Sequence, residues 1–135
     1  MLTLYLFCGA PASGKTTISK QMAEKYNAER ISFDERHYMR HNEMISPILE
    51  ALMDEKNVVA DSVFAYVKQR KMILDAVKNI PCKKILIYMT TPLDECLRRN
   101  ANRKNHLPDF VVESFYNSIE PPTLDEGWDD IWYYK

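Results

Sequence analysis

The sequence predicts an α/β protein of three layers, in which a mostly parallel, five-stranded sheet carries helices on both faces. Two observations predict this class. Five short apolar segments alternate along the chain with stretches whose apolar residues recur at helical spacing. Strands separated by helices are typical of parallel sheets, because a parallel pair needs a long crossover connection. We expect the first strand to lie at the centre of the sheet.

The amino-terminal half accounts for three of the strands. Residues 2–8 (LTLYLFC) form an apolar run that a glycine ends, and residues 29–33 (ERISF) form a shorter one. Between them, residues 15–26 have apolar side chains at helical spacing. Residues 42–56 continue this spacing as a second helix, and residues 57–64 (NVVADSVF) begin as the third strand.

The carboxyl-terminal half repeats the alternation. Residues 67–80 form an amphipathic helix that stops at Pro81, and residues 83–91 (KKILIYMTT) are the clearest buried strand. Residues 92–103 begin with a proline, which is favoured at a helix start. The remaining elements are a short helix, a loop and a last strand, at residues 109–119, 120–128 and 129–134.

Length and composition indicate one globular domain, residues 1–135. Apolar residues make up 46% and charged residues 27% of the chain, and the net charge of −1 gives no overall attraction to nucleic acid or to an acidic membrane. No apolar run approaches the 18 residues or so of a membrane span, so we expect no membrane partner. Three cysteines without metal-binding spacing suit a reducing compartment, and we expect a cytoplasmic protein.

Residues 9–16 (GAPASGKT) satisfy the pattern G-x-x-x-x-G-K-[ST] between a predicted strand and a predicted helix. The glycines let successive N–H groups point inward, and the helix adds the positive end of its dipole. This P-loop predicts binding of a nucleoside triphosphate; an incidental glycine-rich turn is the alternative. Lys15 would reach the β- and γ-phosphates, and the Thr16 hydroxyl would bind Mg²⁺. The expected nucleotide-binding residues are Gly9, Ala12, Ser13, Gly14, Lys15, Thr16 and Thr17.

Two aspartates follow or end strands of the expected sheet. Asp34 comes directly after the second strand and Asp61 ends the third, at the carboxyl edge where open α/β sheets bind ligands. One carboxylate can accept a proton from an attacking hydroxyl, and the other can order the water shell of Mg²⁺. We assign Asp34 to catalysis and acceptor positioning, and Asp61 to the metal. The alternative for each is a helix-capping aspartate.

The segment LRRNANRKN places three arginines on and just after the helix that follows the fourth strand. Arg99 and Arg103 are four residues apart and therefore share a helix face. Mobile arginines can close over a transferring phosphoryl group and neutralise its charge. We therefore predict a lid at about residues 98–108 with Arg99 and Arg103 as catalytic residues, and Arg98 at the surface. A solvated basic helix end is the alternative.

The segments FCGAPASGKTT, ISFDE, VVADSVF, LRRNANR and EPPTLDEGWDDI together resemble the 5′-kinase module of the polynucleotide kinase family, which belongs to the small P-loop kinases. The resemblance covers essentially the whole chain. It implies ATP and Mg²⁺ as cofactors and a 5′-hydroxyl end of DNA or RNA as acceptor. It also implies Asp34 as general base, Arg103 on the transferring phosphoryl group and Arg99 beside it.

The sequence departs from that family in the segment that would bind the acceptor. Such modules usually carry an arginine three residues after the catalytic aspartate, where this chain has His37, with Arg36 before it and Arg40 one turn further on. We assign these three residues, with Asp34, to acceptor binding. The segment between Asp34 and Asp61 is also short. A kinase for a nucleoside, sugar, metabolite or antibiotic is therefore an alternative, and a nucleotide-dependent switch is a third hypothesis from a different class.

Overall fold

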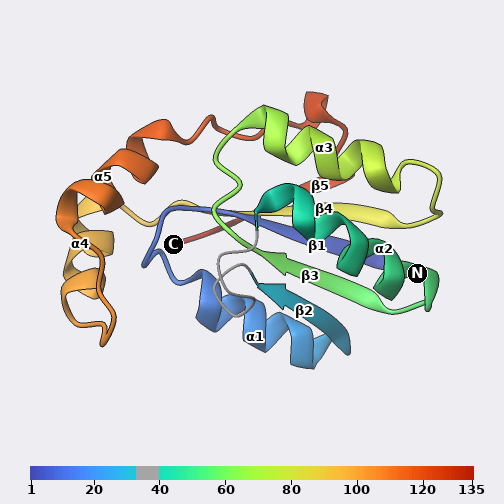
Figure 1. Cartoon of the computed structure of the whole chain (residues 1–135), viewed down its shortest axis with the longest axis horizontal. Helices are drawn as coiled ribbons and strands as arrows, with labels where there is room; N and C mark the ends of the chain where they lie inside the picture. The colour runs from blue at the N-terminus through green and yellow to red at the C-terminus, as the bar shows by residue number, and fades with distance from the viewer. Residues whose placement is uncertain (33–39) are drawn as a thin grey trace.

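The structure is a computed structural model that describes residues 1–32 and 40–135. The described residues form one sheet of five strands, all paired in parallel, in the order β2-β3-β1-β4-β5 (Figure 1). The first strand is therefore central, as the sequence predicts. The strands are β1 (Thr3–Cys8), β2 (Ala28–Ser32), β3 (Asn57–Asp61), β4 (Lys83–Met89) and β5 (Asp130–Tyr134).

Helices cover both faces of this sheet, which confirms the predicted three layers. In Figure 1, α1 lies on one side of the sheet, α2 and α3 lie on the other, and α4 and α5 lie together beyond the carboxyl ends of the strands. Of the helices in the described part of the chain, none has the length and apolar character needed to cross a bilayer. The helices are α1 (Lys15–Lys25), η2 (His41–Met44), α2 (Ile45–Met53), α3 (Val67–Val77), α4 (Leu93–Ala101), α5 (Asp109–Ser118) and η3 (Leu124–Glu126), the two η elements being short 3₁₀ turns.

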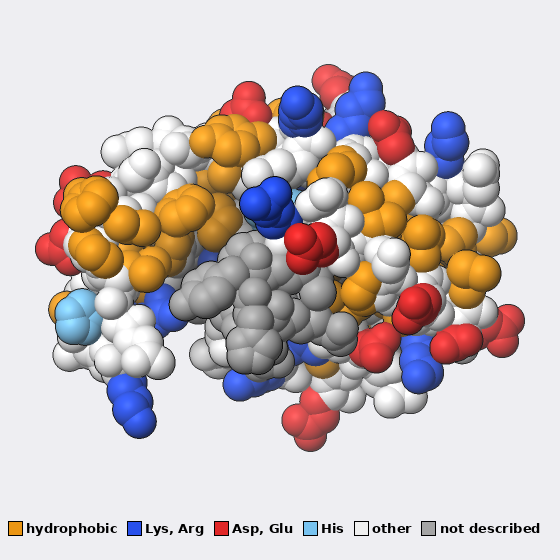
Figure 2. Space-filling view, in the orientation of Figure 1, with side chains coloured by type: hydrophobic (Ala, Val, Ile, Leu, Met, Phe, Trp, Pro, Cys, Tyr) orange, Lys and Arg blue, Asp and Glu red, His pale blue; other side chains and the backbone are white. Residues whose placement is uncertain are grey.

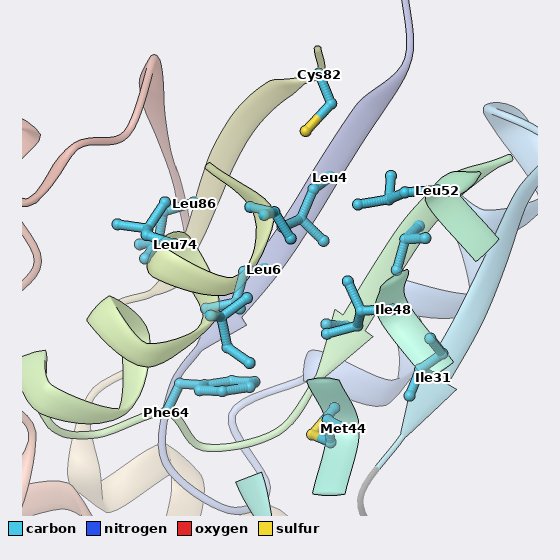
Figure 3. Packing of buried hydrophobic residues seen from close by; sticks show 14 of the residues in the cluster. Leu4, Leu6, Ile31, Met44, Ile48, Leu52, Phe64, Leu74, Cys82 and Leu86 are labelled. Carbon is cyan, nitrogen blue, oxygen red and sulfur yellow. The ribbon is translucent and has the colours of Figure 1, made fainter. Parts of the chain in front are cut away.

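Successive side chains of a strand point to opposite faces of the sheet, so the hydrophobic core has two parts. In β1, Leu4, Leu6 and Cys8 pack toward α2 and α3, while Tyr5 and Phe7 pack toward α1. Figure 3 shows the first part, where side chains of the strands meet those of α2 and α3. Because the central strand is buried on both faces, its position is fixed by packing from two sides. The loop that leaves its carboxyl end therefore starts from a rigid support.

The third strand ends at Asp61, as the sequence predicts, although the apolar run continues to residue 64. Phe64 adopts a left-handed conformation with φ +43° that a strand cannot contain. The predicted helix 42–56 begins as the 3₁₀ turn η2 and continues as α2, which ends at Met53, earlier than predicted.

The loop after β3 is held by the fully buried side chain of Arg70, which lies on α3. Its Nη1 donates to the carbonyls of Phe64 at 2.8 Å and Ala65 at 3.1 Å. Its Nε and Nη2 donate to the two carboxylate oxygens of Glu126, each at 2.9 Å, and Nη2 also donates to the Glu120 carbonyl at 2.9 Å. One guanidinium thus joins the β3–α3 loop to the segment 120–126.

Glu126 receives further bonds that keep it ionised. The Trp128 indole N–H donates to one carboxylate oxygen and the Thr123 backbone N–H to the other, both at 3.1 Å. Burial opposes ionisation of Glu126, but the bonds from Arg70, Trp128 and Thr123 outweigh it and hold the pKa of this carboxyl below its ordinary value. Arg70 and Glu126 therefore form a charged, buried and fully bonded pair at neutral pH.

Glu126→Gln tests how much this pair stabilises the fold. Loss of the carboxylate leaves a buried guanidinium without a counter-charge, so we expect the free energy of unfolding at pH 7 to fall by roughly 3–5 kcal/mol in urea titrations. Asp125→Asn removes an exposed carboxylate one residue away and is the matched control, with an expected change within about 0.5 kcal/mol. An equal effect of the two substitutions would contradict the assignment.

Glu126→Gln also tests how the stability that this pair provides depends on pH. Because the folded-state pKa of Glu126 is lowered, its ionisation adds stability above the unfolded-state pKa, and that stability is lost as the pH falls through the lower folded-state pKa. The stability difference between the wild type and Glu126→Gln should therefore shrink as the pH is lowered below about 4.5, the ordinary value. A difference that stays constant down to the acid limit of folding would argue against the ionised pair.

Candidate nucleotide-binding site

The P-loop leaves β1 at Gly9, where the structure has no room for a side chain. A Cβ at this position would lie 2.7 Å from Cβ of Met89, at the end of the neighbouring strand β4. The Gly9 N–H donates to the Val63 carbonyl at 3.0 Å, which ties the loop to the end of β3 as well. At the other end of the loop, Gly14 has φ +102° and directly precedes α1. Glycine is therefore required at both ends of the loop.

The amino terminus of α1 is open toward the P-loop. Among the residues that the structure describes, no side chain caps this helix, and its first turn holds no acidic residue. Thr16 and Thr17, in that first turn, are exposed. The first N–H groups of a helix need acceptors, and the helix dipole favours a negative one. An anion such as a nucleotide phosphate fits this end of the helix.

Lys15 folds back across the loop that precedes it. Its ammonium group donates to the carbonyls of Gly9 at 3.0 Å and Ala10 at 2.9 Å. These bonds hold a positive charge against the loop, where the lysine of a P-loop meets the phosphates. The structure thus brings together the sequence-predicted residues Gly9, Ala12, Ser13, Gly14, Lys15, Thr16 and Thr17 around one concave turn of backbone.

Asp61 lies buried beneath α1 and has two partners that the sequence analysis missed. Its Oδ2 accepts from the Ser19 hydroxyl at 2.7 Å and from Arg30 Nη2 at 2.8 Å. Arg30 Nε also donates to the Ser19 hydroxyl at 2.8 Å, and that hydroxyl lies 3.2 Å from the Thr16 carbonyl. The network links the end of β3 to the first turns of α1. In the sequence, the one indication of this network is an arginine in the short predicted strand ERISF, which does not identify its partners.

The residues assigned to Mg²⁺ carry the hydroxyl and carboxylate oxygens that such an ion accepts as ligands. Mg²⁺ in nucleotide sites is usually held by one or two protein oxygens, phosphate oxygens and several waters. The Thr16 hydroxyl is exposed in the first turn of α1, and the Asp61 carboxylate is joined to that turn through Ser19. The assignment of Thr16 and Asp61 to the metal remains a prediction.

Of the three lid arginines, the structure brings Arg99 to the P-loop. Arg99 Nη1 donates to the Ser13 carbonyl at 3.2 Å and lies 3.2 Å from the place that a Cβ on Gly14 would take. Arg98 instead pairs with Glu95 on the exposed side of α4, as a surface residue would. Arg103 lies in the exposed turn after α4, where its N–H donates to the Asn100 carbonyl at 3.1 Å. Its assignment to the phosphoryl group stays a prediction.

A cavity of about 440 Å³ opens beside the loop, between the start of α4 and the end of β5. Its lining combines two arginines and a lysine with two carboxylates. Glu95 bonds to Arg98 and faces Arg99 at 3.8 Å, so part of this charge is paired within α4. The lining residues are Thr91, Pro92, Asp94, Glu95, Arg98, Arg99 and Lys135.

The predicted acceptor-binding residues Asp34, Arg36 and His37 lie outside the described residues. Arg40, the fourth, is exposed directly before η2. Next to it, His41 Nε2 lies 2.8 Å from the Ser62 hydroxyl, and its ring packs 4.4 Å from the ring of Phe64. Burial lowers the pKa of His41 to about 4, so this imidazole is neutral at pH 7. The pairing of His41 with Ser62 was not predicted.

The P-loop class of nucleotide-binding proteins has a glycine-rich loop between a strand and a helix, followed by a lysine for the phosphates. This chain has that loop between its central strand and the open end of α1, and Lys15 folds over it. Residues 4–122 match the AAA domain family, and the chain belongs to that family.

Several relatives match most of this chain. They include an L-seryl-tRNA(Sec) kinase of Methanococcus maripaludis, 27% identical over 93% of this chain, and a bifunctional polynucleotide phosphatase/kinase of Schizosaccharomyces pombe, 26% identical over 95% of it. A probable gluconokinase of Schizosaccharomyces pombe is 26% identical over 91% of this chain. This chain spans 56%, 32% and 75% of the lengths of these three relatives. Among solved structures, Chaetomium thermophilum Kti12 in complex with ADP-AlF3 has a TM-score of 0.84 at 15% identity and covers 96% of this chain and 87% of its own. That likeness shows the fold.

Gly9→Ala tests the P-loop directly. The added Cβ would meet Met89 at 2.7 Å, so the loop must shift, and we expect affinity for Mg·ATP to fall about tenfold or more in calorimetric titrations. Gly127→Ala is the control, because its positive φ of +122° strains an alanine outside the P-loop, and the new Cβ meets Leu74 only at 3.5 Å. It should lower the unfolding temperature and leave nucleotide affinity unchanged. Wild-type affinity of Gly9→Ala would contradict the site.

Proposed function

We propose that this chain transfers the γ-phosphate of ATP to a hydroxyl group. The observation that carries the proposal is the open amino terminus of α1, with Lys15 held across the glycine loop in front of it. This arrangement suits a polyphosphate and leaves its far end at the carboxyl edge of the sheet, where open α/β sheets bind their ligands. The names of the relatives, which describe kinases for different acceptors, support phosphoryl transfer and do not single out one acceptor.

We assign each residue of the proposed site one role. Loop N–H groups and Lys15 bind and orient the phosphates, while Thr16 and Asp61 hold Mg²⁺, which when bound neutralises phosphate charge. Asp34 accepts the proton of the attacking hydroxyl. Arg99 and Arg103, in the lid of residues 98–108, stabilise the charge that develops on the transferred group and exclude water. Alignment and charge neutralisation thus supply most of the catalysis.

A 5′-hydroxyl end of a polynucleotide or oligonucleotide is the acceptor that we favour. Beyond the P-loop, α5 exposes Phe110 and Phe115, whose exposed fractions are 71% and 41%. Figure 2 shows hydrophobic side chains gathered over this helix. Arg103 and Lys104 are exposed in the turn that leads to it. Aromatic faces beside cations are typical of surfaces that bind single strands. Arg36, His37 and Arg40 would hold the acceptor phosphate nearest to the 5′-hydroxyl.

Asp34→Asn separates chemistry from nucleotide binding. Loss of the general base should reduce kcat about 100-fold or more while Mg·ATP affinity stays at the wild-type value. Glu35→Gln removes the neighbouring carboxylate and serves as the matched control, with kcat expected close to wild type. The assay is an acceptor screen with γ-labelled ATP over 5′-hydroxyl DNA, 5′-hydroxyl RNA, nucleosides and hydroxyl metabolites. Label on no acceptor, with intact ATP affinity, would overturn the kinase proposal in favour of a nucleotide-dependent switch.

A small hydroxyl compound is the second candidate acceptor. The net charge of −1 and the short segment between Asp34 and Asp61 favour it, since they provide neither a general electrostatic attraction nor an insertion to grip a nucleic acid. The neutral His41–Ser62 pair beside Arg40 is also suited to an uncharged, hydrogen-bonding ligand.

A salt titration distinguishes the two acceptors. Binding of an oligonucleotide through three phosphate contacts should weaken about 20-fold between about 50 and 200 mM salt, because counterions are released. A small neutral acceptor should change less than about twofold over the same range. The KM for ATP measured across the same series is the control for the salt dependence of the nucleotide itself. A flat response with a 5′-hydroxyl oligonucleotide would contradict the nucleic-acid acceptor.

A further inference from the structure

The carbonyl of Ser13 in the P-loop accepts hydrogen bonds from two residues of the β4–α4 region. The Thr91 hydroxyl donates to it at 2.7 Å, and Arg99 Nη1 donates at 3.2 Å. Thr91 lies just after β4 and is 2% exposed. A carbonyl oxygen has two lone pairs, so these two donors fill it. Thr91 is not among the residues assigned above to nucleotide, metal or acceptor.

The two donors differ in how easily they can leave. The Thr91 bond is short and buried, on a short side chain next to a strand end. Arg99 makes a longer bond from a flexible side chain that is 37% exposed, and its Nε faces Glu95 at 3.8 Å. Arg99 can therefore exchange its partners at moderate cost, whereas Thr91 stays on the Ser13 carbonyl.

Within the part of the chain that the structure describes, Ser13 is enclosed. Ser13 is 1% exposed, which leaves little access for water. Its own hydroxyl has no hydrogen-bond partner within the described residues and lies 3.0 Å from the place that a Cβ on Gly9 would take. Leaving a buried acceptor without any donor is costly. If both donors were lost, the loop would have to change shape to satisfy this carbonyl.

We propose that Thr91 is a positioning residue of the P-loop, whose hydroxyl keeps the Ser13 carbonyl bonded when Arg99 turns from the loop to the γ-phosphate. The step rests on the proposed function in one respect, the movement of Arg99 to the phosphate. With Thr91 in place, that movement leaves the carbonyl with one donor. Without the hydroxyl, Arg99 is the remaining donor, and its departure would leave a buried acceptor unpaired.

Thr91→Val removes the donor at nearly constant volume. We expect affinity for a non-hydrolysable ATP analogue with Mg²⁺ to fall about tenfold. In this variant Arg99 is the remaining donor to the Ser13 carbonyl, so moving Arg99 to the γ-phosphate leaves that carbonyl without a hydrogen bond. Affinity for ADP, which lacks that phosphate, should fall less than about threefold. Thr91→Ser should restore both affinities. Thr90→Val is the matched control, because the Thr90 hydroxyl also donates to a carbonyl, that of Tyr134 at 2.9 Å on β5.

The outcomes separate a positioning role from a purely structural one. Equal losses for ADP and the ATP analogue, or a lower unfolding temperature with unchanged affinities, would overturn the proposal. These are binding measurements on the full chain without an acceptor, so a failed acceptor screen would overturn the kinase function and leave this test standing.

Discussion

The candidate site depends on the buried pair of Arg70 and Glu126, although neither residue touches it. Arg70 binds the carbonyls of Phe64 and Ala65 and so fixes the turn after β3, including the strained left-handed backbone at Phe64. One residue earlier in the same turn, the Val63 carbonyl accepts from the first N–H of the P-loop. A guanidinium on α3 therefore holds the turn to which the first residue of the phosphate loop is bonded. A buried charge is costly, and it is retained here with all of these bonds made.

Local patterns in the sequence predict the secondary structure and sheet of this protein, but not its buried ion pairs. Five strands, their parallel order around β1 and the open helix at Lys15 follow from apolar periodicity and glycine spacing within short windows. Arg70, in the segment VKQRK, has the pattern of a surface residue of an amphipathic helix, and Glu126 lies 56 residues away in a predicted loop. Such pairs depend on tertiary contacts, which periodicity does not encode.

The candidate site likewise contains residues that local patterns predict and residues that they do not. The residues of the P-loop could be predicted because a phosphate cradle needs its glycines and lysine at fixed spacing. Ser19 and Arg30, which surround Asp61, could not, since serine in a helix and arginine in a strand are common at surfaces. Of the lid arginines, spacing alone placed Arg99 and Arg103 on one face, whereas the helix ends at Ala101 and leaves Arg103 in the following turn. Helix ends are set by caps and contacts more than by charge spacing.

The partners of Asp61 bear on the role proposed for this residue. Oδ2 of Asp61 accepts two bonds, from Ser19 and Arg30, which is the capacity of one carboxylate oxygen. That oxygen is therefore closed to an attacking hydroxyl, and the charge of Asp61 is balanced by a guanidinium beneath α1. A proton acceptor for phosphoryl transfer needs an open oxygen within hydrogen-bond reach of the acceptor. Under the proposed function this role falls to Asp34, while Oδ2 of Asp61 joins the end of β3 to α1 through Ser19.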